Sequence, residues 1–307
     1  MFKLKKKILI TGGTGFLGFN YLNFLKKKKI YTLYSLSRKL PSKVNKINSV
    51  KYLVGNLSDI KSLKCIRNMK FNYVINFAGN INHKEKIKTM NSHYKGVVNL
   101  VKTLNRKDLI KFVQIGSSVE YGKTKSPQIE PKKIPMNKKI YSIYGQAKLF
   151  STIFLMKENK KNNFPSVIIR PYLIYGPFQT PNRLIPYSII SCLKRKNFPC
   201  SSGIQTRDFL YVTDALNFIY KIMIGKDVGM IINLGSGKKM KVKTVIKYIA
   251  KICKGGLPNF GQLKLRKDEI MNLYPSVSLA KSKKWKQKID ILKGLKLTIS
   301  HYKRNFK

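Results

Sequence analysis

The chain has 307 residues, of which 43% are hydrophobic and 11% are aromatic. This composition is typical of a folded protein with one large or two small domains, and it excludes an intrinsically disordered chain. No uninterrupted apolar run approaches the roughly 18–20 residues that a membrane-spanning helix needs, so we expect no membrane span.

Positive charge dominates the sequence, because 63 Lys and Arg stand against 12 Asp and Glu and give a formal net charge of +51. Such a charge attracts polyanions, including nucleic acid, acidic membranes and phosphorylated substrates. The lysines are nevertheless spread along the whole chain, and no basic patch interleaved with aromatic residues accompanies them. We therefore interpret most of the charge as solvated surface and predict no dedicated nucleic-acid partner. A nucleic-acid-binding protein stays open as the remote alternative.

The four cysteines, Cys65, Cys192, Cys200 and Cys253, show neither paired spacing nor the spacing of metal ligands. Scattered cysteines of this kind are typical of a reducing compartment. We therefore predict a cytoplasmic protein without a metal site, in which the thiols are chemically inert.

The first predicted elements carry the most information. An apolar run ends at Thr11, so a strand is predicted over 6–11, and a helix is predicted over 16–28. Gly12 permits a tight turn, Gly15 allows a close approach of the backbone to a pyrophosphate, and Gly18 allows close packing of helix on strand. Because the helix N-terminus adds an anion site, the sequence predicts a dinucleotide-binding turn. The residues expected to contact the dinucleotide are Gly12, Thr14, Gly15, Phe16, Leu17 and Gly18.

Apolar runs and helical patterns then alternate through the first half of the chain. Further strands are predicted over 30–37, 50–54, 71–78, 110–117 and 165–170, and further helices over 58–68, 85–105 and 141–160. This alternation predicts βαβ units, and thus an α/β fold with a Rossmann-type doubly wound parallel sheet. Ligands of such sheets bind beyond the carboxyl ends of the strands, so we expect the loops after 11, 37, 55, 78 and 117 to line the site.

The end of the second predicted strand bears on which dinucleotide is bound. NAD-selective sites of this type hold the ribose 2′-hydroxyl with an acidic residue, whereas an Arg nearby accommodates the 2′-phosphate of NADP. This strand ends at Ser37-Arg38, and no Asp or Glu occurs before Asp59. Arg38 therefore favours NADP over NAD.

Two segments further on carry candidate chemistry. Tyr144 and Lys148 lie four residues apart in a predicted helix, so they share a face and the ammonium can stabilise an ionised phenol. Ser117 follows the fifth predicted strand, at the edge of the sheet where ligands bind. A hydroxyl there can donate a hydrogen bond to a substrate oxygen beside the phenol. Together with the glycine turn, these residues predict a hydride-transfer site.

The second half of the chain is interrupted by prolines between 171 and 186 and by glycines at 235–237 and 255–256. These breaks predict shorter, mixed elements in a smaller α/β lobe. We expect a dinucleotide-binding domain over 1–170 and a mainly substrate-binding lobe over 171–307, parts of which return to the first domain.

The chain resembles the extended short-chain dehydrogenase/reductases of the nucleotide-sugar epimerase/dehydratase family over essentially its whole length. The segments that carry the resemblance are Thr11–Gly18, Val74–Gly79, Asn91, Tyr144–Lys148, Arg170–Pro177, Arg207–Asp214, Asn233–Gly237, Arg266 and Ser278–Lys281 with Trp285. The resemblance implies an NAD(P)-dependent enzyme that acts on a sugar linked to a nucleoside diphosphate. It also implies a homodimer formed through the helices near 85–105 and 141–160.

The resemblance assigns roles to individual residues. Tyr144 would be the acid/base on the sugar oxygen, Lys148 would tune it and hold the nicotinamide ribose, and Ser117 would orient the reacting oxygen. Arg207 and Arg266 would hold the substrate pyrophosphate, since planar guanidinium groups suit phosphate oxygens. The further residues expected to contact the cofactor are Asn56, Leu57, Ala78 and Asn91.

Departures from the family pattern narrow the expected reaction. Family dehydratases carry Asp-Glu directly after the catalytic Thr, whereas this chain has Ser118 and Val119 there. Asn56 stands where an Asp commonly contacts adenine, and Leu173 where an Asn often lies near the substrate phosphate. We therefore predict NADPH-dependent reduction of a nucleotide-linked 4-keto-(6-deoxy)hexose. An NAD-dependent 4-epimerase of nucleotide-linked hexoses is the alternative.

Overall fold

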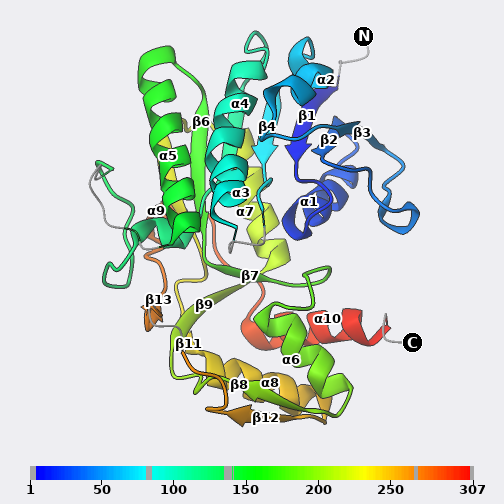
Figure 1. The fold of residues 1–307 in the computed structure, drawn as a ribbon, viewed down its shortest axis with the longest axis vertical. Coiled ribbons are helices and arrows are strands. Elements are labelled where there is room, and N and C mark those ends of the chain that lie inside the picture. Colours follow the sequence, from blue (N-terminus) through cyan, green and yellow to red (C-terminus); the bar gives the residue numbers. More distant parts are fainter. Residues whose placement is uncertain (1–4, 81–84, 135–139, 141, 266–268, 305–307) are drawn as a thin grey trace. The chain divides into compact units, whose positions relative to one another are not determined.

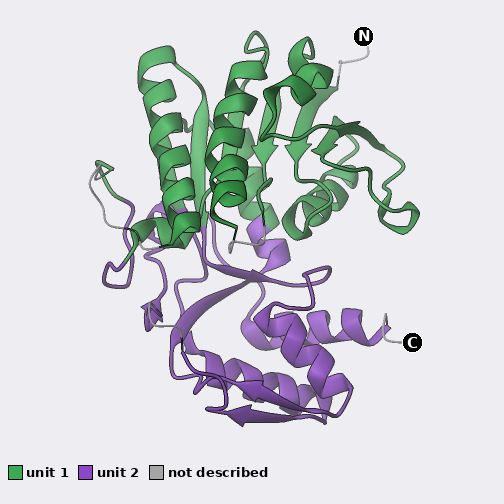
Figure 2. Ribbon diagram, in the orientation of Figure 1, with its two compact units in different colours: residues 1–122, 131–170, 216–232 green, residues 123–130, 171–215, 233–307 purple. Residues whose placement is uncertain are grey.

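The chain folds into two units, which Figure 2 draws in different colours. The computed structural model describes residues 5–80, 85–134, 140, 142–265 and 269–304. Unit 1 consists of residues 1–122, 131–170 and 216–232, and unit 2 of residues 123–130, 171–215 and 233–307. No helix in these described ranges is long and apolar enough to cross a membrane.

A seven-stranded sheet forms the centre of unit 1. Its strands are β1 (Lys6–Thr11), β2 (Tyr31–Ser37), β3 (Val50–Val54), β4 (Tyr73–Asn76), β5 (Lys111–Ile115), β6 (Ser166–Pro171) and β10 (Met230–Leu234), in the order β10-β6-β5-β4-β1-β2-β3. From β6 to β3 in this order, each strand pairs in parallel with its neighbour. The predicted α/β fold with a Rossmann-type parallel sheet is therefore confirmed, and the ends of the six predicted strands differ from β1–β6 by two residues at most.

Both faces of this sheet are buried, which explains why its strands read as continuous apolar runs. One face packs through Leu9, Val74 and Phe112 against helices α4 (Gly96–Thr103) and α5 (Ile143–Asn162). Helices α1 (Phe16–Lys26) and α7 (Val212–Ile224) lie behind the sheet in the view of Figure 1. These two helices contact each other, since the Tyr21 hydroxyl lies 3.5 Å from the Met223 sulfur.

Two predicted helices differ in detail from the structure. The segment predicted over 58–68 forms a 3₁₀ turn, η2 (Ile60–Leu63), followed by the short helix α2 (Lys64–Arg67). The Asp59 carboxylate accepts a hydrogen bond from the Lys61 backbone and so starts the 3₁₀ turn. The segment predicted over 85–105 consists of α3 (Lys86–Met90), a π-helical segment labelled η3 (Asn91–Lys95), and α4. Short 3₁₀ turns η1 (Lys43–Asn45) and η4 (Ser118–Tyr121) complete this unit.

Unit 2 contains two smaller sheets and a group of helices. Strand β9 (Thr206–Tyr211) pairs with β7 (Leu173–Tyr175), β11 (Lys239–Lys241) and β13 (Asn272–Leu273), and β8 (Asn197–Cys200) pairs with β12 (Leu257–Phe260). Helices α6 (Leu184–Leu193), α8 (Val242–Cys253) and α10 (Ile291–Arg304) pack against one another, and α9 (Ser278–Ser282) is a short helix. Unit 2 thus contains the short, mixed strands and helices that were predicted for the second half of the chain.

Candidate active site

The glycine turn lies where the strand order of the sheet reverses. Strand β1 is flanked by β2 on one side and β4 on the other, and ligands of such sheets bind at this switch point. Gly12 has φ +69, and a Cβ on it would lie 2.9 Å from the Cα of Ala78, in the loop that follows β4. A Cβ on Gly18 would lie 2.3 Å from the Gly12 carbonyl oxygen. The turn thus requires glycine for backbone conformation at one position and for close packing at both.

A helix begins directly after this turn. Gly15 is the N-cap of α1, and no side chain caps the helix there. Its backbone nitrogen donates to the Gly12 carbonyl at 3.0 Å, which holds the turn against the helix. Phe16 and Leu17 form the first, half-buried residues of α1. The positive end of the helix dipole and its backbone N–H groups therefore form an anion site of the kind that holds a pyrophosphate.

The carboxyl end of β2 adjoins the glycine turn. The Gly12 backbone nitrogen donates to the Leu36 carbonyl at 2.9 Å, and the Thr14 hydroxyl lies 3.5 Å from the Ser37 hydroxyl. Arg38 follows Ser37 and is exposed. The structure thus brings a cation to the end of β2, beside the predicted pyrophosphate site.

The other predicted cofactor contacts lie on three further loops and helices of unit 1. Asn56 is exposed and its side chain accepts from the Ser58 backbone at 3.1 Å, while Leu57 is buried against α4. Ala78 is half-buried beside Gly12, and Asn91 is the half-buried first residue of the π-helical segment. The structure therefore brings Ala78 to the glycine turn itself.

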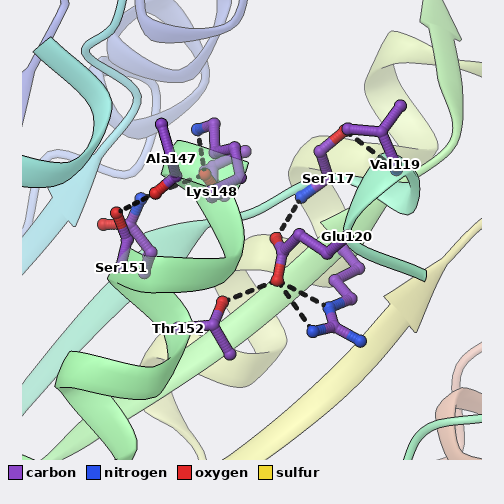
Figure 3. A network of polar contacts seen from close by, with 10 residues as sticks. Ser117, Val119, Glu120, Ala147, Lys148, Ser151 and Thr152 are labelled. Carbon is purple, nitrogen blue, oxygen red and sulfur yellow. Dashed lines mark hydrogen bonds and ion pairs between the residues drawn. The ribbon is translucent and has the colours of Figure 1, made fainter. Parts of the chain in front are cut away.

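A buried carboxylate organises the turn after β5 (Figure 3). The Glu120 side chain accepts a hydrogen bond from the Ser117 backbone nitrogen at 2.7 Å and another from the Thr152 hydroxyl at 2.7 Å. The Arg170 guanidinium pairs with the same carboxylate at 2.8 Å, and both residues are only 1% exposed. Glu120 thereby fixes the Ser117 turn to α5 and to β6.

Ser117 lies at the start of this turn as the N-cap of η4. Its hydroxyl oxygen accepts a hydrogen bond from the Val119 backbone nitrogen at 3.4 Å. A Cβ on Gly116 would lie 2.4 Å from a Glu120 carboxylate oxygen, so glycine is required for the carboxylate to reach its position. The turn also packs against α5, because a Cβ on Gly145 would lie 3.3 Å from the Val119 carbonyl oxygen.

Lys148 lies in the second turn of α5 with its ammonium inside the unit. Its Nζ donates to the carbonyl oxygen of Ile115, the last residue of β5, at 2.6 Å. Burial lowers the pKa of Lys148 to about 8, against an opposing effect of the Glu120 carboxylate. A buried lysine with a lowered pKa at the carboxyl end of a strand is typical of a functional site.

Tyr144 lies one turn before Lys148 on α5. The Lys148 ammonium is 5.9 Å from the centre of the Tyr144 ring, and the ring packs edge-on against His93 with a centroid distance of 4.9 Å. His93 belongs to the π-helical segment and is held by hydrogen bonds, one from the Ser151 hydroxyl to its carbonyl and one between its ring and the Asn80 carbonyl. The structure therefore brings Ser117, Tyr144 and Lys148 onto adjoining segments of one unit.

The two predicted pyrophosphate arginines have different outcomes. Arg207 is on β9 in unit 2, where its buried guanidinium forms an ion pair with Glu269 and donates to the Thr206 carbonyl at 2.7 Å. Arg266 lies outside the described residues. Arg207 thus has a carboxylate partner, which the sequence analysis did not anticipate.

Sequence reasoning missed several residues that shape the site. The roles of Glu120 and Arg170 depend on a pairing across 50 positions, which no local pattern indicates. His93 fills the space over Gly79, since a Cβ there would lie 2.0 Å from its ring. Gly13 is a third spatially required glycine of the turn, after Gly12 and Gly18, because a Cβ on it would lie 2.2 Å from the Ser35 hydroxyl. The doubled Gly12-Gly13 was the one available signal.

Known sequences resemble this chain over most of its length. Residues 8–235 match the NAD-dependent epimerase/dehydratase family. The dTDP-D-glucose 4,6-dehydratase of Homo sapiens is 25% identical over an alignment of 328 positions, which covers 98% of this chain and 91% of that protein. The CDP-abequose synthase of Salmonella muenchen is 29% identical over 130 positions, which cover 41% of this chain and 44% of that protein.

Two solved structures resemble the fold. A UDP-glucose 4-epimerase from Thermotoga maritima, solved with UDP-glucose, matches with a TM-score of 0.88 at 20% identity, covering 98% of this chain and 100% of that one. A dTDP-glucose 4,6-dehydratase from Bacillus anthracis, solved with NAD, matches with a TM-score of 0.84 at 23% identity, covering 98% and 97%. At these identities the likeness establishes the fold.

Proposed function

The chain belongs to the NAD-dependent epimerase/dehydratase family, and from that premise we propose that it reduces the 4-keto group of a nucleotide-linked hexose with NADPH. The observation that carries this proposal is the group of Ser117, Tyr144 and Lys148 in unit 1, with the Lys148 ammonium 5.9 Å from the Tyr144 ring centre. Such a group has a chemical use in proton transfer to a substrate oxygen and no use in binding alone.

The relatives support a nucleotide sugar as the substrate. Their names refer to dTDP-D-glucose, CDP-abequose and UDP-glucose, so the shared chemistry is a hexose on a nucleoside diphosphate. We propose that unit 2 supplies most of the contacts to this substrate and that Arg207 and Arg266 bind its pyrophosphate. The pyrophosphate would then either displace Glu269 from Arg207 or bind to Arg207 beside Glu269.

The residues around the glycine turn fit a nicotinamide dinucleotide. The backbone N–H groups at the start of α1 would hold its pyrophosphate, and the spaces that a Cβ on Gly12 or Gly18 would fill are taken by backbone. Lys148 would hold the nicotinamide ribose from the carboxyl end of β5. When bound, this cofactor supplies the hydride for the reaction.

The protein groups would handle the proton. The Tyr144 phenol donates its proton to the C4 oxygen as negative charge develops there, and the Lys148 ammonium stabilises the phenolate that remains. Ser117 donates a hydrogen bond to the same oxygen, because its hydroxyl accepts from Val119 and keeps its own hydrogen to give. Glu120 keeps the Ser117 turn in position throughout.

The buried carboxylate also argues against dehydration. Elimination of water needs a free acid and base beside the sugar. In the turn from Gly116 to Gly122, all of which the structure describes, Glu120 is the only carboxylate. Its oxygens accept bonds from Ser117, Thr152 and Arg170, and it is 1% exposed. A carboxylate held in this way supports reduction over elimination.

Arg38 supports NADPH as the preferred cofactor. It is exposed at the end of β2, and the chain has no acidic residue before Asp59 to hold a ribose 2′-hydroxyl. We expect Arg38→Ala to lower kcat/KM for NADPH about ten- to a hundredfold and to leave that for NADH unchanged, since one charge-assisted contact is lost. Lys39→Ala is the matched control, and equal losses with both cofactors would contradict the preference.

A 4-epimerase that retains NAD is the second candidate. It is favoured by the match to the UDP-glucose 4-epimerase fold and by the fact that the same three residues can serve oxidation and reduction in turn. The remote alternative, a nucleic-acid-binding protein, rests only on the net charge of +51. Salt-sensitive RNA or DNA binding that Tyr144→Phe leaves intact would favour it.

We also propose a homodimer formed through α3 and α5. Ile87 on α3 and Phe150 on α5 are 76% and 42% exposed, and large apolar side chains on adjacent helices are suited to a second copy. A monomer in sedimentation velocity at micromolar concentration would contradict this.

A screen of nucleotide sugars with NADPH and with NAD, in which product and cofactor are measured together, tests the proposed function. We expect a 4-keto sugar to be reduced with consumption of one NADPH per product. Tyr144→Phe should lower kcat about 10²- to 10⁴-fold, whereas Tyr94→Phe on the π-helical segment should leave it unchanged. Protein purified with tightly bound NAD and interconverting two sugars without net cofactor change would overturn the reductase in favour of the epimerase.

A further inference from the structure

Two of the four cysteines meet in unit 2 although they are far apart in the sequence. Cys192 lies in the last turn of α6, and Cys253 is the last residue of α8. The two helices pack against each other, and the Cys192 and Cys253 thiols are hydrogen-bonded to each other. Their spacing of 61 positions (253 − 192) gave the sequence analysis no reason to pair them.

The chain after Cys253 is shaped around Cys192. Gly256 has φ +76, and a Cβ on it would lie 2.6 Å from the Cys192 Cα and 3.1 Å from its Sγ. A Cβ on Gly255 would lie 3.0 Å from the Cys192 carbonyl oxygen. These two glycines let the backbone that follows α8 pass directly over Cys192, so the contact between the two cysteines is enforced by the fold and not by the side chains alone.

The two thiols differ in access and in acidity. Cys192 is 1% exposed, whereas Cys253 is half-buried. The hydrogen bond from Cys192 lowers the pKa of Cys253, and the positive charge of Lys303 on α10 lowers it further. The same hydrogen bond, together with burial, raises the pKa of Cys192. Accessible thiols with a lowered pKa react first with oxidants, and a neighbouring thiol then completes a disulfide.

We propose that Cys192 and Cys253 form a reversible disulfide when the protein meets a peroxide, with Cys253 as the attacking thiolate and Cys192 as the resolving thiol. The Cys253 sulfur attacks one peroxide oxygen, the O–O bond breaks, and hydroxide leaves, so that Cys253 becomes a sulfenic acid. The Cys192 sulfur then attacks the Cys253 sulfur, loses its proton, and displaces the hydroxyl as water. In sum two thiols are oxidised by two electrons and one hydrogen peroxide is reduced to two waters.

Neither of the other cysteines is equipped for this reaction. Cys200 is buried, and burial together with the neighbouring Cys192 raises its pKa to about 11, so it remains a thiol. Cys65 lies on α2 in unit 1 and is exposed as a residue, but partial desolvation of its sulfur raises its pKa. Cys192 and Cys253 are therefore the pair of thiols that can form the bridge. The bridge would join the ends of α6 and α8 and would close a loop of about sixty residues, which should raise the midpoint of thermal unfolding.

Oxidation of the reduced full-length protein with a small excess of hydrogen peroxide tests the proposal. The protein is then unfolded in denaturant so that buried thiols also react, the remaining thiols are alkylated with N-ethylmaleimide, and the intact mass and the peptides are measured. We expect a loss of two thiols, a peptide that links Cys192 to Cys253, alkylation of Cys65 and Cys200, and recovery of all four thiols with dithiothreitol. Four alkylated thiols after the same treatment, or a bridge between any other pair, would overturn the proposal.

Single substitutions separate the two roles. In Cys192→Ser the sulfenic acid on Cys253 has no resolving thiol, so dimedone should label Cys253 in nearly every molecule. In Cys253→Ser dimedone should not label Cys192, and no disulfide should form. Cys65→Ser is the matched control and should give the wild-type yield of disulfide. Labelling of Cys192 in Cys253→Ser would contradict the assigned order, and the wild-type peptide map tests the pairing even where a variant folds poorly.

Discussion

Glu120 in unit 1 and Asp208 in unit 2 are both buried acids that hold a turn, yet they are compensated in different ways. Glu120 pairs with Arg170 and accepts from Ser117 and Thr152. Asp208 accepts from the Ser236 backbone and hydroxyl and from the Gly237 backbone. Burial raises the pKa of Asp208 to about 6, although these hydrogen bonds lower it.

The difference shows what a buried cation adds to a buried acid. Backbone N–H groups satisfy the hydrogen bonds of Asp208 but carry no full charge, so desolvation of the carboxylate still dominates. A guanidinium compensates the charge of the carboxylate as well, but its own buried charge then needs that carboxylate as a counterion. We therefore expect the Glu120 turn to be sensitive to loss of the partner, and the Asp208 turn to be sensitive to pH.

The largest expected effect is that of Glu120→Gln. This change leaves the buried Arg170 guanidinium without a counterion and should lower the free energy of unfolding by about 3–5 kcal/mol. Urea unfolding at neutral pH measures it. Glu158→Gln is the matched control, since the Arg106–Glu158 pair is partly exposed and should contribute less than about 1 kcal/mol. Equal effects of the two substitutions would contradict the comparison.

The next largest expected effect is a change of stability with pH that comes from Lys148, one of the candidate catalytic residues. Burial lowers the pKa of Lys148 from 10.5 to about 8, so between these values the unfolded chain holds a proton that the folded chain has lost. Stability should therefore rise with pH over this window, by about 3–4 kcal/mol in the limit. Lys148→Met should remove that rise in urea unfolding measured from pH 7.5 to 10.5. A constant difference between the two proteins at every pH would speak against it.

The pH effect expected of Asp208 is slightly smaller and has the opposite sign. Its pKa is raised from 3.8 to about 6, so between these values the folded chain holds a proton that the unfolded chain has lost. Stability should fall as the pH rises through this window, by about 3 kcal/mol at most, and Asp208→Asn should abolish the fall. Unfolding curves from pH 4 to 7 measure this. A wild-type stability that rises over the window by more than the variant's would show that the hydrogen bonds outweigh burial.

The same contrast separates what the sequence could predict from what it could not. The glycine turn could be predicted because a side chain at Gly12 or Gly18 would collide with nearby backbone, so the requirement shows directly in the residue type. The predicted fold and family are confirmed. The role of Glu120 was not readable, since it depends on Thr152 and Arg170, which only the folded chain brings near. The roles of Ser117, Tyr144 and Lys148 stay predictions, although the structure brings their segments together.

Other features escaped prediction for related physical reasons. The helical pattern over 85–105 gave no sign of the π-helical segment, because apolar periodicity does not record a single widened turn. The helix predicted over 58–68 begins as a 3₁₀ turn, because the Asp59 side chain accepts a hydrogen bond from the Lys61 backbone at its start. The cysteine pair depends on the packing of α6 against α8, which residue spacing does not encode.

The fate of the hydride tests the central claim most directly. The protein is mixed with NADPH that carries deuterium on the transferred position of the nicotinamide and with a nucleotide-linked 4-keto-6-deoxyhexose, and the sugar product is examined by NMR and mass spectrometry. The account predicts one deuterium at C4 of the product, one NADP formed per product, and neither with Tyr144→Phe. A sugar product free of deuterium, or one formed while the cofactor stays reduced, would contradict it.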